Sequence, residues 1–88
     1  MASKRLLKRD VNYVMGDIIE AAYIHQLASP KQDPKKTEEI VEEAIATFDE
    51  LIAKINKKDV ENKKQHFKSV EKDLESKAND LIEKINKL

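Results

Sequence analysis

The sequence predicts an all-α protein, an antiparallel up-down-up three-helix bundle that forms a single domain over residues 1–88. Apolar residues recur at helical spacing in three long segments. Two breaks with helix-ending residues separate these segments, and both are short enough for consecutive helices to pack antiparallel. We therefore expect helices at about 3–28, 34–57 and 60–87.

The first segment has apolar residues on two sides of the expected helix, at about 100° per residue. One side is expected to face the core and holds Leu7, Val11, Val14, Ile18, Ala21, Ala22 and His25, flanked by Met15 and Ile19. The far side holds Leu6, Tyr13, Gly16, Glu20, Tyr23, Ile24 and Leu27. A helix with two apolar sides needs two partners, so we expect the far side to contact another chain.

On this far side, residues alternate at spacings of three and four, which is the pattern of a second helix–helix seam. The seam consists of Tyr13, Gly16, Glu20, Tyr23 and Leu27. Tyrosine favours protein interfaces because it buries area and keeps a polar group. The pattern therefore predicts a homodimer, and binding of another protein is also compatible with it. The alternative is that this side packs inside the bundle, with the core stripe rotated from its expected position.

Gly16 lies in the middle of the first expected helix. Glycine there costs about 1 kcal/mol relative to alanine. It indicates either a tolerated bend or the close approach of another helix, and the sequence favours neither.

The second helix has clear start signals and one core-facing stripe. Pro30 ends the preceding helix within the linker 29–33, and Asp33 and Pro34 suit the N-cap and first helical positions. The expected core stripe contains Ile40, Val41, Ala44, Ile45, Phe48, Leu51, Ile52 and Ile55. Its acidic start matches the positive end of the helix dipole, so no metal site is needed to explain that cluster.

The other two helix starts are read from single polar residues. Ser3 is the expected N-cap of the first helix. Asp59 is a candidate N-cap for the third, but the next turn is poor in apolar residues, so that helix could also begin after Asn62. The third core stripe is expected to contain Phe67, Val70, Leu74, Ala78, Leu81, Ile82, Ile85 and Leu88.

The charge balance argues against two classes of partner. Lysine plus arginine equals aspartate plus glutamate at 17 each, which argues against a dedicated nucleic-acid or membrane-surface binder and does little to oppose self-association. No apolar run approaches the roughly 18 residues of a membrane span, and charged residues directly after Leu7 argue against a signal peptide. The absence of cysteine fits a cytoplasmic location.

The basic start of the chain carries an alternative function. Lys4, Arg5, Lys8 and Arg9 could contact nucleic acid, as in a ribosome or nucleic-acid accessory factor. Lys4 and Arg5 also have the wrong sign for the first turn of a helix, so that turn either frays or has an anionic partner. A third reading, an immunity-type or inhibitor bundle, rests on size and helicity alone.

No motif for catalysis, cofactor binding or metal binding occurs, and the sequence predicts a protein that is not an enzyme. No nucleophile has a base and an orienting group at a suitable spacing. His25 belongs to the core side of the first helix, whereas His66 is expected at the surface, and the sequence assigns no role to either.

Two stretches, Lys8-Arg-Asp-Val-Asn-Tyr13 and Asn79-Asp-Leu-Ile-Glu-Lys-Ile-Asn-Lys-Leu88, with the pair His66-Phe67 between them, resemble a family of small bacterial helical proteins of uncharacterised function. Together they cover about a fifth of the chain. The resemblance implies an all-helical fold and brings no activity, cofactor or catalytic residue.

Overall fold

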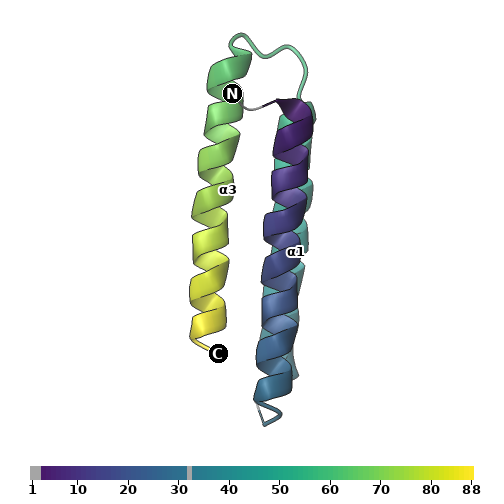
Figure 1. The fold of residues 1–88 in the computed structure, drawn as a ribbon, viewed down its shortest axis with the longest axis vertical. Coiled ribbons are helices and arrows are strands. Elements are labelled where there is room, and N and C mark those ends of the chain that lie inside the picture. The colour runs from purple at the N-terminus through teal and green to yellow at the C-terminus, as the bar shows by residue number, and fades with distance from the viewer. Residues whose placement is uncertain (1–2, 32) are drawn as a thin grey trace.

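The computed structural model describes residues 3–31 and 33–88, which form three helices. α1 spans Lys4–Ala28, α2 spans Pro34–Asn56 and α3 spans Lys63–Asn86. Every helix packs against the other two, in a rod of 50 × 19 × 17 Å. α1 and α3 run in the same direction and α2 runs in the opposite one, so the predicted up-down-up bundle is confirmed (Figure 1).

The first two helices begin at the predicted caps. Ser3 Oγ accepts a hydrogen bond from the Leu6 amide at 3.2 Å, and Asp33 Oδ1 accepts one from the Lys35 amide at 3.0 Å. Pro34 occupies the first turn of α2, where its missing N–H leaves no bond unmade. Residue 32, inside the predicted linker, lies outside the described residues.

Of the two predicted starts of the third helix, the one near residue 60 is wrong and the one after Asn62 is confirmed, because α3 begins at Lys63. Its N-cap is Asn62, whose Oδ1 accepts a hydrogen bond from the Gln65 amide at 3.1 Å. Asp59 has a φ of 61°, in the left-handed region, whereas an N-cap residue adopts an extended conformation. Asp59 therefore belongs to the turn between α2 and α3.

The core stripe of α1 is rotated from its predicted position. Met15, expected at the flank, is 1% exposed, whereas Val14 is only partly buried and Ala21 is exposed. The α1 residues of the core are Leu7, Val11, Met15, Ile18 and Ala22. Rotation toward Met15 moves the centre of the stripe further from the far side of the helix, which stays outside the bundle.

Two residues predicted for the core are largely exposed. Ile45 of α2 is 49% exposed and Ile82 of α3 is 45% exposed. Each lies at one edge of its apolar stripe, where only part of a side chain can reach the layer between the helices. The core from these helices contains Ile40, Val41, Ala44, Leu51, Ile55, Val70, Leu74, Ala78, Leu81 and Ile85.

Candidate functional site

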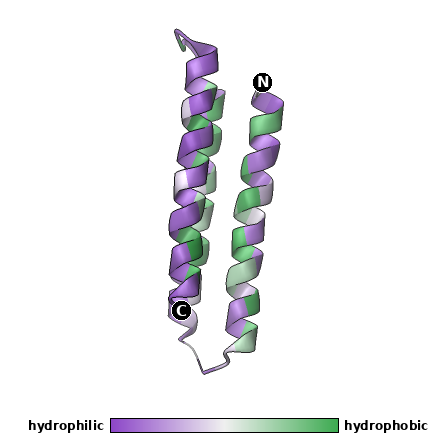
Figure 2. Ribbon diagram, turned by 60° about the vertical axis from the view of Figure 1, so that its left-hand side comes forward, coloured by the Kyte–Doolittle hydropathy of each residue, from purple (hydrophilic) through white to green (hydrophobic). Residues whose placement is uncertain are grey.

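Most of the large apolar side chains that are exposed in the described part of the chain belong to α1. Tyr13 is 61% exposed and Leu27 is 80% exposed. The large apolar residues left exposed are Leu6, Tyr13, Tyr23, Ile24, Leu27, Ile45 and Ile82, five of them on α1. In Figure 2, hydrophobic residues recur along α1, whereas α3 turns mainly hydrophilic residues toward the viewer.

We call the predicted set Leu6, Tyr13, Gly16, Glu20, Tyr23, Ile24 and Leu27 the outer face of α1. All of these residues are exposed, and all point away from the core stripe of the helix. The alternative in which this side packs inside the bundle is therefore wrong for the single chain. No partner chain is present, so the predicted interface remains a prediction.

Gly16 is not required by packing within the chain. A Cβ atom built at Gly16 would meet nothing of the described chain within 4 Å, apart from the backbone of its own helix. Its φ is not positive, so the backbone does not need glycine either. The structure thus leaves the residue without an explanation inside one subunit.

The two exposed isoleucines of the other helices flank α1. Ile45 precedes Lys54 by nine residues, which places it about 180° round α2 from the side chain that binds Asp73 of α3. Ile82 follows Asp73 by nine residues and lies about 180° round α3 from it. Both therefore lie on the sides of their helices that border α1.

These isoleucines also lie at the same height along the bundle. Lys84 and Glu43 form an ion pair and so lie at the same height. Because α2 and α3 are antiparallel, residue 82 then lies level with residue 45. The hydrogen bond from Thr37 Oγ1 to Gln26 Oε1, at 2.6 Å, sets residue 45 level with residue 18 of α1. The two isoleucines therefore lie at the height of the middle of α1, close to residue 18.

The side of the bundle between α2 and α3 is charged instead. Lys54 Nζ lies 3.0 Å from Asp73 Oδ2 and 3.4 Å from Glu50 Oε1, and Lys84 Nζ donates to Glu43. The hydrogen bond to Asp73 is the largest of the effects that raise the pKa of Lys54. The ion pairs between helices thus join α2 to α3, whereas most of the exposed large apolar side chains lie on α1.

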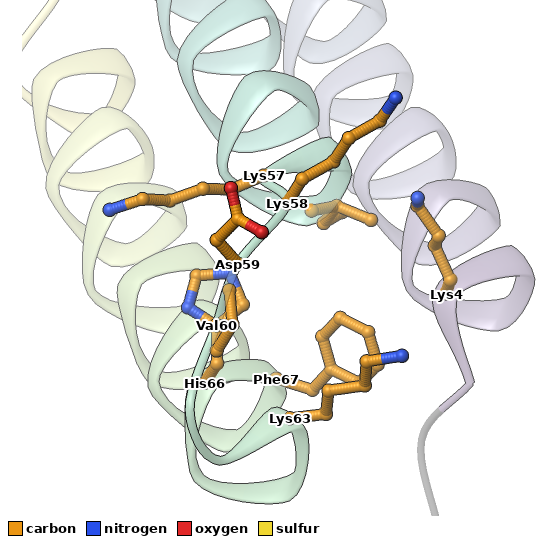
Figure 3. Close-up of a pocket in the computed structure, with 9 residues that line it drawn as sticks. Lys4, Lys57, Lys58, Asp59, Val60, Lys63, His66 and Phe67 are labelled. Carbon is orange, nitrogen blue, oxygen red and sulfur yellow. The ribbon is translucent and has the colours of Figure 1, made fainter.

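A hollow of about 360 Å³ lies at the end of the bundle where α1 begins and α2 ends. Figure 3 shows it between the start of α1, the 57–62 turn and the first turns of α3. It is lined by Lys4, Ile55, Lys57, Lys58, Asp59, Val60, Lys63, His66 and Phe67. Four of these residues are lysines and one is an acid, and Figure 3 shows the side chains of Lys57 and Lys58 extending away from the hollow in opposite directions.

The four cations of the basic start do not share one surface. Lys4 lines the hollow, whereas Arg9 lies on the outward side of α1. Lys8 precedes Gln26 by five full turns and so lies on the side of α1 that contacts α2. The structure adds lysines at 57, 58 and 63 that sequence reasoning missed. The up-down-up topology alone could have indicated these lysines, because it brings the start of α1, the end of α2 and the start of α3 to the same end of the bundle.

His66 has a role within the fold. Its Nε2 lies 2.6 Å from the carbonyl oxygen of Lys54, in the last turn of α2, and its ring lies 5.9 Å from that of Phe67. The carbonyl can only accept, so Nε2 carries the proton and donates to it. The expectation of a surface position is wrong, because His66 is partly buried. His25 is also partly buried, near the other end of the bundle.

Residues 3–31 and 33–88 contain no cluster of three or more histidine, cysteine, aspartate or glutamate side chains suited to a metal ion. In the same residues, no helix combines the length and apolar character needed to cross a bilayer.

Comparisons of the chain with protein-family models, with curated proteins and with solved structures give no match. The resemblance to small bacterial helical proteins therefore stays a prediction from the sequence.

Proposed function

We propose that this protein is a non-enzymatic helical bundle that acts through protein contacts and self-associates through the outer face of α1. The observation that carries the proposal is the concentration of exposed apolar side chains on α1 and on the two isoleucines beside it. Contiguous exposed apolar surface is typical of protein interaction sites. A near-zero net charge leaves little long-range repulsion between copies.

The size of the chain supports the same proposal. A single core in a chain of 88 residues rarely supplies more than about 3–5 kcal/mol of net stability. Association adds buried area without disulfides, which a chain lacking cysteine cannot form. The same lack of cysteine is consistent with a reducing compartment, so we place the protein in the cytoplasm.

The test is the oligomeric state of a variant in which both outward tyrosines become charged. Tyr13→Glu combined with Tyr23→Glu is expected to give a monomer in size-exclusion chromatography with light scattering, with the helical circular dichroism unchanged. A matched control, Ser69→Glu with Ser76→Glu, adds the same charge to exposed positions of α3 and is expected to leave the dimer intact. An unchanged dimer in the tyrosine variant would contradict the proposed interface.

A second candidate function is the binding of a nucleic acid at the basic end, because Lys4 lies beside three further lysines in one hollow. Phosphate contacts of this kind produce binding that weakens steeply with salt. Fluorescence anisotropy of a labelled single-stranded RNA at about 50 and 200 mM salt measures this directly.

The matched variants for this candidate change equal numbers of lysines. Lys4→Gln, Lys57→Gln and Lys63→Gln together are expected to abolish binding, whereas Lys31→Gln, Lys77→Gln and Lys87→Gln, away from the hollow, are expected to preserve it. The absence of any binding at low salt would remove the candidate.

A further inference from the structure

We infer that the partner on the outer face of α1 is a second copy of this chain, packed antiparallel so that Arg9 of each subunit meets Glu20 of the other. The inference rests on the proposed self-association and specifies its geometry. Arg9 extends the outer face into a seam with alternating spacings of three and four residues. The seam contains Leu6, Arg9, Tyr13, Gly16, Glu20, Tyr23 and Leu27.

Arg9 and Glu20 are both available for contacts with another chain. Within the described chain, Arg9 Nε lies 4.0 Å from Asp10 Oδ1, and both side chains are more than half exposed, so this pair is weak. Glu20 makes no ion pair with any described residue. The seam therefore offers one cation and one anion, about three turns apart on the same side of α1.

An antiparallel contact can place these charges opposite each other. The seam residues form two alternating sets, one with Leu6, Tyr13, Glu20 and Leu27 and the other with Arg9, Gly16 and Tyr23. In an antiparallel pair of helices, a residue of one set faces a residue of the other set. When the numbers of facing residues add to about 29, Arg9 faces Glu20. The same alignment sets Leu6 against Tyr23 and Tyr13 against Gly16. The twofold axis repeats each contact, and the overlap is about 26 Å long.

This alignment also accounts for Gly16. The open space around its Cα would receive the ring of Tyr13 from the other subunit, since small residues let a large side chain approach a helix closely. Ile45 and Ile82, level with residue 18, lie within the overlap and widen the contact on both sides.

Other alignments match less well. A shift of one heptad toward the carboxyl end places Arg9 against Leu27 and Gly16 against Glu20. A parallel dimer in register places Arg9 on Arg9 and Glu20 on Glu20, which are like charges in contact. The antiparallel alignment has one unfavourable feature, because Asp10 and Asp17 flank the seam in both copies. Asp17→Asn is therefore expected to tighten the dimer.

The decisive experiment exchanges the two charges. Arg9→Glu alone sets two glutamates against each other at this contact, and Glu20→Arg alone sets two arginines against each other. Each single change is therefore expected to weaken the dimer at least tenfold in sedimentation velocity. An equimolar mixture of the two single variants forms mixed dimers without like charges in contact and is expected to restore association. The double variant is expected to dimerise like the unaltered chain. In a parallel dimer, neither single change would weaken association.

Orientation is measured independently with a spin label at Ala28→Cys, in a chain that has no other cysteine. The antiparallel alignment separates the two labels by about 40 Å along the helix axis, whereas a parallel one brings them to within about 10 Å. A dimer with close labels, or with single variants that associate normally, would overturn this inference and leave the proposed self-association standing. An unaltered chain that is a monomer would overturn both.

Discussion

The ammonium group of Lys54 connects α2 to α3 by a hydrogen bond of 3.0 Å to Asp73 Oδ2. The carbonyl oxygen of the same residue accepts a hydrogen bond from His66 of α3. Lys54 therefore contacts α3 through both its side chain and its backbone, close to the turn between the two helices.

The side-chain contact predicts a pH dependence at high pH. The pKa of Lys54 is raised above its ordinary value of 10.5, first by the hydrogen bond to Asp73. Desolvation, the second-largest effect, opposes this, and the charge of Asp73 together with the hydrogen bond and charge of Glu50 raises the pKa further. A raised pKa in the folded state contributes stability that is fully present below about pH 10. This contribution is lost as the pH rises through the folded-state pKa.

We therefore expect Lys54→Met to lower the free energy of unfolding by only about 0.2–1 kcal/mol near pH 8, because the pair is exposed and screened by solvent. The difference from the unaltered chain should shrink toward pH 12. Urea denaturation of both chains across this range measures it, and a difference that stays constant with pH would contradict the assignment to Lys54.

The hydrogen bond from His66 to the backbone of Lys54 predicts that replacing His66 destabilises the fold. The carbonyl of Lys54 belongs to the last turn of α2, where the usual helical partners are missing, and it accepts one further hydrogen bond, from the Lys57 amide at 3.3 Å. His66→Ala is expected to lower the free energy of unfolding by about 0.5–1.5 kcal/mol. Lys68→Ala, an exposed position on the same helix, is the matched control. Equal effects of the two changes in urea denaturation would show that the hydrogen bond does not stabilise α2.

Gly16→Ala separates fold stability from association. Alanine at this open helical position is expected to raise the free energy of unfolding of the monomer by about 0.5–1 kcal/mol. In the proposed dimer, the added methyl group would collide with Tyr13 of the partner subunit, and overpacking of about 1–3 kcal/mol would raise the Kd by about 5- to 150-fold. Denaturation at low protein concentration and sedimentation at high concentration measure the two effects. A more stable chain with an unchanged Kd would show that no helix approaches Gly16.

The sequence predicts that the three helices exist better than it predicts where they end and which side chains at the border of each apolar stripe are buried. The start of α2 follows from Asp33 and Pro34, because cap and proline preferences act within a few residues. The sequence places Met15 at the flank of the core stripe and Ile45 within one, whereas Met15 is buried and Ile45 is exposed, since helix rotation depends on how the other two helices pack. The sequence leaves two starts open for α3, at Asp59 and after Asn62, because the left-handed conformation that excludes Asp59 arises from the turn as a whole.

The candidate sites show the same division. The position of the outer face of α1 away from the core could be predicted, because the set lies within one helix and follows its period. The sequence does not indicate that Ile45 and Ile82 lie beside α1. Their height and direction depend on how the helices are aligned, which the two ion pairs between α2 and α3 reveal. Lys4 and Lys63 likewise meet at one hollow only after the chain has folded twice.

The mass of the unaltered protein in solution tests the account most directly. Light scattering after size-exclusion chromatography, over a range from low to high micromolar concentration, should show a shift toward twice the 10.1 kDa of one chain. The outer face of α1 would then be covered in the dimer. A mass of 10.1 kDa at every concentration would contradict self-association through α1.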